Sequence, residues 1–521
     1  MDKIIKNKHY IVLAGCMIFG TAAILALPTH YYFITDDVSV FVVVAKNLFT
    51  GQGYTYGGQP HVWFPPVFPI AIGLFYKIIG DLYVAWLSLC IASFLLSVAL
   101  LFRLGAVVYN KFVGSIAIIL FTTHRLVLSS DYLCCNNQFD ILLVLIALNV
   151  ASGILLDGKI KYKKFILLGV ILGAAILNRP ENIIVSLGLL AALFTQTGLK
   201  IRRKAPAFIC LALVTCSVLF PYMKFLHDHI GKWVFSTKLI ALTDCEKLPE
   251  DFGVLENPCE NFAKVEVGPV GYINDNWVSF LKRYRKEFAD SIGQLSVNLY
   301  YGIGLLLIGL GLFRSRWLPS RKKMEILLIS SLGTLIIVPL VNADPRFYLP
   351  SLPVLLLWMA KGMEEFCIFM KETFGFSKRK AVAFIAILPF LFIVRTVFYI
   401  AEERSDEFNN YYLEYKKMCL WMENNISDIG HKKIGSTHPF ISNILGGIYF
   451  PTFRAGKYEE FIYTLRQAEV EYLVIDEFTM RCYPLYPDYF KDFLADESEY
   501  TELTKIYSIK SPGKIVLYKV K

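Results

Sequence analysis

Residues 34–54 read ITDDVSVFVVVAKNLFTGQGY, and this stretch decides the fold more than any other part of the chain. Two adjacent carboxylates, Asp36 and Asp37, come directly before an apolar segment with helical spacing that runs to Phe49. That segment is too short to cross a bilayer, so we expect it to lie along the membrane interface. Carboxylates next to an apolar surface are energetically unfavourable unless they are exposed to solvent or have a functional role. The pair is therefore a candidate site.

A second informative stretch, HVWFPPVFP at 61–69, follows a turn predicted at 51–54. It leads into another short apolar helix, which we predict at 67–80. Two surface helices that frame a polar turn form a shelf at the membrane boundary. Such a shelf can admit a lipid head group from the side.

The composition of the whole chain is that of a membrane protein. Its 521 residues are 55% hydrophobic, and the formal net charge is +10. The mean hydropathy is +0.49, which is high for a soluble protein of this length. The positive charge falls in short clusters between apolar runs, which is typical of cytosolic loops rather than of a nucleic-acid-binding surface. We therefore expect membrane lipids, and no nucleic acid, as partners.

The apolar runs predict about eleven transmembrane helices. We place them at 10–32, 82–104, 112–129, 139–156, 165–178, 183–196, 205–226, 296–313, 324–341, 347–363 and 381–399. The fifth and sixth are short, roughly 21 Å each against a hydrocarbon core of ~30 Å. The turn between them, Asn178 to Asn182, is polar, and we expect it to line a cavity; the alternative is an Arg–Glu-paired turn at the surface.

Six clusters of Lys and Arg set the orientation. Each falls after an even number of predicted spans: 3–8, 103–111, 159–164, 200–204, 314–323 and 378–380. The positive-inside rule then places the amino terminus in the cytosol and the carboxy terminus outside. We predict a multi-pass protein of the cell inner (plasma) membrane whose C-terminal part is periplasmic or extracellular.

The polar segments divide the chain into two predicted domains. A transmembrane domain at 1–400 includes extracytoplasmic loops at 33–81 and 227–295, and a shorter one at 129–138. The remainder, 401–521, alternates strand-like runs at 471–476 and 514–518 with helical stretches at 411–424 and 457–468, which predicts a small α/β domain. Cys245 and Cys259 fall in the same extracytoplasmic loop, where either a disulfide or two free thiols would fit.

The stretch at 35–54, together with PPVFPIAIGLFYKIIGD at 65–81, resembles the first extracytoplasmic loop of GT-C glycosyltransferases. It is most similar to the bacterial branch that includes protein O-mannosyltransferases and the lipid A aminoarabinose transferase. Three further segments resemble motifs of that branch in the same order: NRPE at 178–181, HIGKWVFST at 229–237 and RFYLPSLP at 346–353. The resemblance covers about 1–400 and implies a GT-C fold.

The resemblance also implies a chemistry. A sugar carried on a polyprenyl phosphate is transferred to an acceptor hydroxyl outside the membrane, usually with inversion, and a carboxylate of the first loop accepts the hydroxyl proton. The family pattern maps this base to Asp36. For Asp37, a helix cap or a supporting role is as reasonable as catalysis. Relatives place an acidic residue of the second short loop near the site, which maps to Asp131 or to Asp140, although Asp140 also fits a helix cap.

The leaving phosphate needs positive charge and hydrogen-bond donors. The motifs map this role first to Arg346 and second to Arg179, with Tyr348 and Glu181 of the same two motifs as further substrate-binding candidates. His61 and Lys46 of the shelf complete the set, although a solvated loop His and a snorkelling Lys are the plainer interpretations. Some relatives carry a Lys before the Pro-Pro pair, whereas this chain has Phe64, so that phosphate ligand is missing.

We predict an enzyme without a cofactor and without a metal site, because no Cys/His cluster has metal-ligand spacing. Its partners would be a polyprenyl-phosphate-linked sugar and a glycan, lipid or protein acceptor. Two other functions use similar lipids. A transporter or flippase usually shows repeated halves and mid-membrane charges, and neither is evident here. An O-antigen ligase or polymerase usually has its characteristic motifs in a large periplasmic loop toward the carboxy terminus. In this chain the informative motifs lie in the first loop.

Overall fold

The computed structural model describes most of the 521 residues. The described ranges are 8–27, 37–56, 59–129, 136–157, 159–196, 201–237, 277–299, 302–314, 317–335, 345–405, 411–436, 440–445, 447–451, 457–477, 489–495, 500–510 and 514–521. Among the site candidates, Asp36 and Asp131 lie outside these ranges, as do Cys245 and Cys259.

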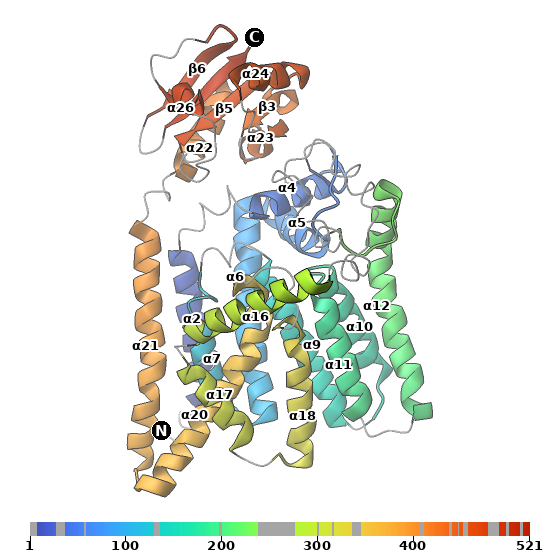
Figure 1. Ribbon diagram of the computed structural model, residues 1–521, viewed down its shortest axis with the longest axis vertical. Coiled ribbons are helices and arrows are strands. Elements are labelled where there is room, and N and C mark those ends of the chain that lie inside the picture. Colours follow the sequence, from blue (N-terminus) through green and yellow to red (C-terminus); the bar gives the residue numbers. More distant parts are fainter. Residues whose placement is uncertain are drawn as a thin grey trace.

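The part of the chain up to residue 405 forms a bundle of helices (Figure 1). Its long elements are α2 (Lys8–Ala26), α6 (Leu82–Val108), α7 (Lys111–Thr122), α9 (Asn137–Asp157), α10 (Tyr162–Ile176), α11 (Asn182–Gln196), α12 (Ile201–Ile230), α18 (Pro319–Ser330), α20 (Leu352–Phe374) and α21 (Lys378–Ser405). Each of these overlaps one of the predicted spans. Asp81 and Asn110 cap the starts of α6 and α7 by accepting hydrogen bonds from backbone N–H groups one turn in.

The predicted span at 296–313 is not one straight helix. The chain instead forms α16 (Trp277–Asn298) and α17 (Ile303–Phe313), whose axes differ by 92°. Gly302, directly before α17, has a φ of 89°, in the left-handed region that favours glycine. A residue in that conformation cannot continue a right-handed helix, so the direction of the chain changes there.

By length and hydropathy, four of the described helices could each cross a bilayer: α2, α6, α9 and α12. The number rises to five if α16 and α17 are counted as one broken span. Helices α7, α10 and α11 are shorter, at 12 to 15 residues. The count of eleven spans therefore stays a prediction.

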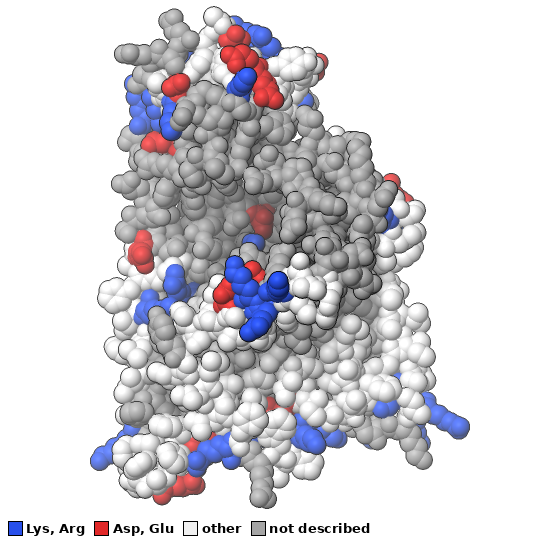
Figure 2. Space-filling view, viewed as in Figure 1, with Lys and Arg blue, Asp and Glu red and all other residues white. Residues whose placement is uncertain are grey.

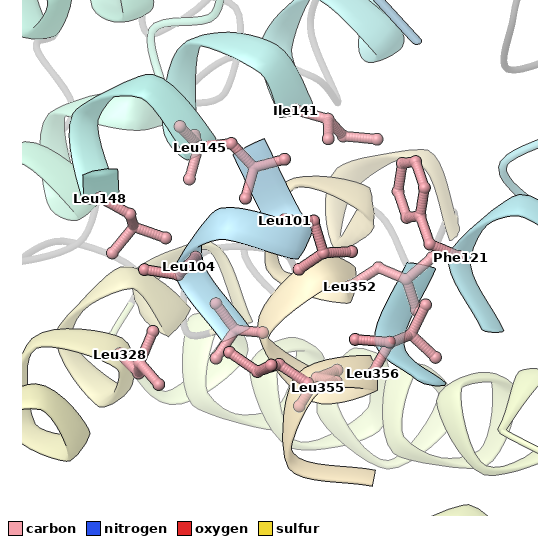
Figure 3. Close-up of a cluster of buried hydrophobic side chains, with 14 of the residues drawn as sticks. Leu101, Leu104, Phe121, Ile141, Leu145, Leu148, Leu328, Leu352, Leu355 and Leu356 are labelled. Carbon is pink, nitrogen blue, oxygen red and sulfur yellow. The ribbon is translucent and has the colours of Figure 1, made fainter. Parts of the chain in front are cut away.

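The core of the bundle is a continuous apolar cluster in which α6, α7, α9 and α20 meet. Figure 3 shows its side chains directed toward one another, among them Leu101, Leu104, Phe121, Ile141, Leu145, Leu352, Leu355 and Leu356. Glycines allow α17 and α20 to touch. A Cβ on Gly362 would lie 1.8 Å from the Leu307 carbonyl oxygen, and one on Gly311 would lie 2.3 Å from that of Trp358. Small residues permit such close approach between helices in a membrane.

The basic clusters gather at one end of the bundle. The end of α6, the starts of α12 and α18 and the turn between α20 and α21 all lie at the lower end in Figure 1. Figure 2 shows Lys and Arg side chains along the same edge, separated from the opposite end by a largely uncharged band. The predicted topology requires these clusters to share a side under the positive-inside rule, and it stays a prediction.

The C-terminal part is a five-stranded sheet with short helices, at the end of the molecule opposite the basic clusters (Figure 1). Its strands are β3 (Lys433–Ser436), β4 (Ile448–Pro451), β5 (Tyr472–Asp476), β6 (Leu503–Ile509) and β7 (Ile515–Val520), in the order β4-β3-β5-β7-β6. β3 is parallel to β4 and β5, whereas β7 is antiparallel to β5 and β6. The helices are α22 (Tyr411–Asn425), α23 (Phe440–Leu445), α24 (Tyr458–Gln467) and α26 (Tyr489–Leu494). The strands and helices expected from the sequence are present, and β3, β4 and β6 are additional.

Candidate active site

The first loop forms the two short helices expected from its sequence. α4 (Asp37–Phe49) and α5 (Val67–Ile79) pack against each other and are joined by the small hairpin β1 (Thr55–Tyr56) and β2 (Gln59–Pro60). Figure 1 shows both helices lying across the end of the bundle nearest the C-terminal sheet, not parallel to the long helices. Asp37 is the first residue of α4, where its charge favours the helix dipole.

Hydroxyl groups from within the loop and from distant segments fix the loop between the two helices. The Tyr54 hydroxyl donates to the Phe64 carbonyl at 2.7 Å, and the Thr237 hydroxyl donates to the Val62 carbonyl at 2.7 Å. Tyr222 of α12 donates to the Phe64 carbonyl at 3.2 Å. Burial raises the pKa of Tyr54, so its hydroxyl keeps the proton that this bond needs. The segment after α12 is therefore part of the shelf, which its sequence did not indicate.

A second group of polar residues lies where α9 begins and where α10 turns into α11. The Asp140 carboxylate is fully buried and accepts hydrogen bonds from the Asn178 amide at 2.9 Å and the Asn182 amide at 2.6 Å. The Asn136 amide donates to the Asn178 carbonyl at 2.8 Å. Asp140 thus anchors both ends of the turn that carries Arg179, and this turn is held against the start of α9 with Asn178, Arg179 and Asn182 buried.

Arg179 joins this turn to the segment before α20. Its guanidinium donates to the Asn137 side chain and, at 3.2 Å, to the backbone carbonyl of Arg346. It also lies 3.9 Å from the Glu181 carboxylate, so the predicted Arg–Glu pair exists, at the edge of ion-pair distance. A single aromatic ring, Phe347, lies 5.0 Å from the Arg179 guanidinium and 5.2 Å from that of Arg346. Two cationic groups are therefore gathered around one ring.

Arg346 connects the turn to the shelf. It belongs to the short helix η3 (Pro345–Phe347), and its guanidinium lies 3.8 Å from the Asp37 carboxylate. Both side chains are partly open, at 35% and 38% exposed. An exposed ion pair of this length contributes little to stability, so Arg346 can exchange its partner for a stronger anion. Figure 2 shows the surface hollowed on this face below the C-terminal part, with acidic and basic side chains in the hollow.

The remaining candidates have structural contacts of their own. The His61 ring is buried, accepts a hydrogen bond from the Phe64 backbone N–H at 3.1 Å and packs against the rings of Tyr54 and Tyr56. Tyr348 is buried and its hydroxyl accepts from the Asn298 amide at 2.8 Å. Lys46 is half-buried in the last turn of α4, and this burial lowers the pKa of its ammonium group. Their predicted contacts with substrate stay predictions.

Three asparagines of the site were not among the residues expected from the sequence. Asn137, Asn178 and Asn182 hold the charged residues in place, yet only the charged members of their segments were singled out. The signal was present, because asparagines flank both the Arg-Pro-Glu motif and the start of α9. Among the described residues, no three His, Cys, Asp or Glu side chains gather as a metal site.

Comparisons with known proteins agree on one fold. Residues 64–222 match the family model described as dolichyl-phosphate-mannose-protein mannosyltransferase, which is less than half of the chain. No curated protein sequence matches the chain. Among solved structures, the oligosaccharyltransferase AglB from Archaeoglobus fulgidus, in complex with an inhibitory peptide and a dolichol-phosphate, has a TM-score of 0.58 at 11% identity, covering 98% of this chain and 76% of that one.

A second solved structure matches over almost the full length of both chains. It is ArnT from Cupriavidus metallidurans bound to undecaprenyl phosphate, with a TM-score of 0.57 at 10% identity, covering 98% of this chain and 97% of that one. Identities this low show the fold and not the substrate. The GT-C resemblance inferred from the first loop is confirmed at that level.

Proposed function

We propose that this chain, which has the fold of the GT-C glycosyltransferases, transfers a sugar from a polyprenyl-phosphate donor to an acceptor hydroxyl. The observation that carries the proposal is the ion pair between Arg346 and Asp37 at the start of α4. It joins a cation suited to a phosphate with the residue that directly follows Asp36, the candidate base. Asp37 begins a helix of the shelf, whose two helices are too short to cross a bilayer, and Arg346 reaches it from η3.

In the proposed reaction, the acceptor hydroxyl oxygen attacks the anomeric carbon while the Asp36 carboxylate takes the hydroxyl proton. The bond between that carbon and the phosphate oxygen breaks, and the electron pair leaves with the polyprenyl phosphate. Arg346 stabilises the charge that develops on the leaving oxygen, and Arg179 adds a second positive charge nearby. Attack opposite the leaving group inverts the anomeric centre. These steps use only the side chains of this chain and need no cofactor.

We further propose a location for the reaction. The site would open on the extracytoplasmic face of the inner (plasma) membrane, with 1–400 as the catalytic domain and the sheet of 401–521 above it, shaping access for the acceptor. This placement rests on the basic clusters, which gather at the opposite end of the bundle. The acceptor would be a lipid-linked glycan, lipopolysaccharide, a wall polymer or a protein, and the sugar a hexose or a pentose.

The direct test is Asp36→Asn in a membrane preparation supplied with a labelled polyprenyl-phosphate sugar. Loss of a general base lowers the rate of transfer about 100- to 10,000-fold, while the donor still binds. Asp37→Asn is the matched control and should have a smaller effect, because Asp37 pairs with Arg346 and starts a helix. Unchanged transfer in the Asp36 variant would remove the catalytic assignment. Movement of the donor across the membrane without transfer would favour a transporter instead.

A further inference from the structure

Helix α16 differs from the other long helices of the bundle in direction and in composition. It turns by 92° from α17, and Figure 1 shows it crossing the bundle near the upper ends of α10 and α11. Unlike a lipid-spanning helix, its 22 residues include many charged ones, WVSFLKRYRKEFADSIGQLSVN. A helix with this composition and direction suits the plane of a membrane interface rather than its interior.

The apolar residues of α16 form a stripe that the protein leaves open. At 3.6 residues per turn, Trp277, Leu281, Phe288 and Ile292 fall on one face of the helix. Their exposed fractions run from 42% to 56%. The stripe is stiffened by ring stacking between Tyr284 and Phe288, at 6.1 Å and 17°. Exposure of large apolar side chains in a row marks a surface that meets lipid or another partner.

Charge is divided unequally between the two flanks of this stripe. Arg285 and then Lys282 follow the stripe around one side of the helix, and both are exposed. Glu287 lies on the other side of the stripe, and Lys286 and Asp290 share the face opposite to it. Long basic side chains beside an apolar face can bury their stems in lipid and hold their charges at the phosphate level. An anionic head group is the partner that this arrangement fits.

The carboxy end of α16 is attached to the candidate active site. The Asn298 amide donates to the Tyr348 hydroxyl at 2.8 Å, and α16 contacts η3, which carries Arg346. Since the helix is anchored there, its position along the membrane normal fixes the height of η3.

We propose that α16 lies in the membrane interface and binds anionic phospholipid head groups through Lys282 and Arg285, and thereby holds the Arg346 segment at head-group level. The proposal concerns bilayer phospholipid and does not depend on the glycosyl-transfer chemistry. A lipid partner explains both the open apolar stripe and the cations beside it, whereas a protein partner would have to cover both.

The first test measures the depth of Trp277 in the full chain reconstituted into phosphatidylcholine nanodiscs. The difference in fluorescence between the wild type and Trp277→Phe isolates this residue, and brominated phosphatidylcholine should quench it while aqueous acrylamide should not. Trp421→Phe is the matched control, since Trp421 stacks on Tyr507 in the C-terminal sheet part and should not respond to brominated lipid. Quenching of the Trp277 component by acrylamide alone would overturn the proposal.

The second test measures lipid selectivity by electron spin resonance of spin-labelled phosphatidylglycerol and phosphatidylcholine bound to the chain. Replacing Lys282 and Arg285 together by Gln should lower the preference for phosphatidylglycerol at this helix by roughly fivefold for each charge removed. The double variant Lys282→Arg/Arg285→Lys keeps the charge and should keep the preference, and Lys286→Gln, on the opposite face of the helix, is the matched control. An unchanged preference in the double Gln variant would overturn the assignment of these cations. The Trp277 measurement needs only one conservative change, so misfolding of the double Gln variant leaves the proposal testable.

Discussion

Two polar clusters lie at opposite ends of the same bundle, and they are built differently. At the end with the basic clusters, Glu325 of α18 is fully buried, and its carboxylate meets Arg321 at 3.0 Å, the Tyr109 hydroxyl at 2.6 Å and the Trp358 indole at 2.9 Å. Beside it, Lys361 of α20 lies within 2.8 Å of two carboxylates, Glu364 and Glu365. Here charged groups pair directly with one another within α18 and within α20, and the hydrogen bonds of Glu325 join α18 to the end of α6 and to α20.

The cluster at the other end pairs its charges less closely. One oxygen of the Asp140 carboxylate accepts hydrogen bonds from two asparagine amides, and Arg179 donates two of its hydrogen bonds to neutral oxygens. The closest ion pair to the shelf, Arg346 with Asp37, spans 3.8 Å and is partly exposed. Closely paired buried charges fix a structure, whereas cations held in place by neutral groups keep their charge available to a ligand. The contrast favours a structural role for the first cluster and supports the proposed substrate-binding role of the second.

The largest effect on stability should come from Glu325→Ala. Removing one partner of a buried ion pair leaves Arg321 unpaired and destabilises a protein by about 3–5 kcal/mol. The expected result is a large fall in the midpoint of thermal unfolding, with unchanged transfer per folded molecule below that temperature. Glu372→Ala serves as the control, because Glu372 pairs with Arg314 at 3.0 Å on the surface and its loss costs about 1 kcal/mol or less. If the Glu325 variant unfolded at the wild-type temperature but no longer transferred the sugar, the structural role of this cluster would be wrong.

Arg346→Gln should have the opposite profile. We expect a fall in the transfer rate of about 100- to 1,000-fold, because a donor to the leaving phosphate is removed. Thermal unfolding should change little, since the ion pair with Asp37 is long and partly exposed. Arg466→Gln, an exposed arginine that bonds the Lys521 carbonyl, controls for the general loss of a positive charge. A stability loss as large as that of Glu325→Ala would make Arg346 a structural residue.

A third variant tests whether Asp140 acts through the turn that carries Arg179. Asp140→Asn leaves two amide donors without a charged acceptor, so we expect a loss of about 1–3 kcal/mol in the free energy of unfolding. The affinity for the polyprenyl-phosphate sugar should fall as well, and a double-mutant cycle with Arg179→Gln should show that the two effects on this affinity are not additive. Additive effects would mean that Asp140 does not position Arg179.

The smallest expected effect concerns the shelf. Thr237→Val removes the hydroxyl that donates to the Val62 carbonyl, and a single neutral hydrogen bond contributes about 1 kcal/mol. Hydrogen exchange should therefore speed up locally, at residues 59–66, without a change in global unfolding. Thr195→Val is the control, because that hydroxyl bonds only within its own helix, to the Ala191 and Ala192 carbonyls. Equal exchange in both variants would show that the segment after α12 does not hold the loop.

The elements predicted from the sequence are those with a strong local signal. The two short helices of the shelf begin and end within about one residue of their predicted bounds, because apolar periodicity bounded by Asp, Gly and Pro is a local property. The broken span at 296–313 was not predicted, since hydropathy averages over residues and does not register a left-handed glycine such as Gly302. The charged α16 was passed over for the same reason, because its apolar residues are a minority.

The sequence by itself determined that this chain is an apolar, helix-rich protein with its basic clusters on one side, and it pointed through short motifs to a GT-C fold. These conclusions depend on composition and on neighbours in the chain. Only the tertiary structure decided which polar residues meet. Asp37, Arg179 and Arg346 are far apart in sequence and converge because α4, α9 and the turn after α10 pack at one end of the bundle. The asparagines that hold these residues in place are uncharged, so they do not stand out in the sequence. They matter because they are buried, where hydrogen bonds are stronger and an unmade one costs more free energy.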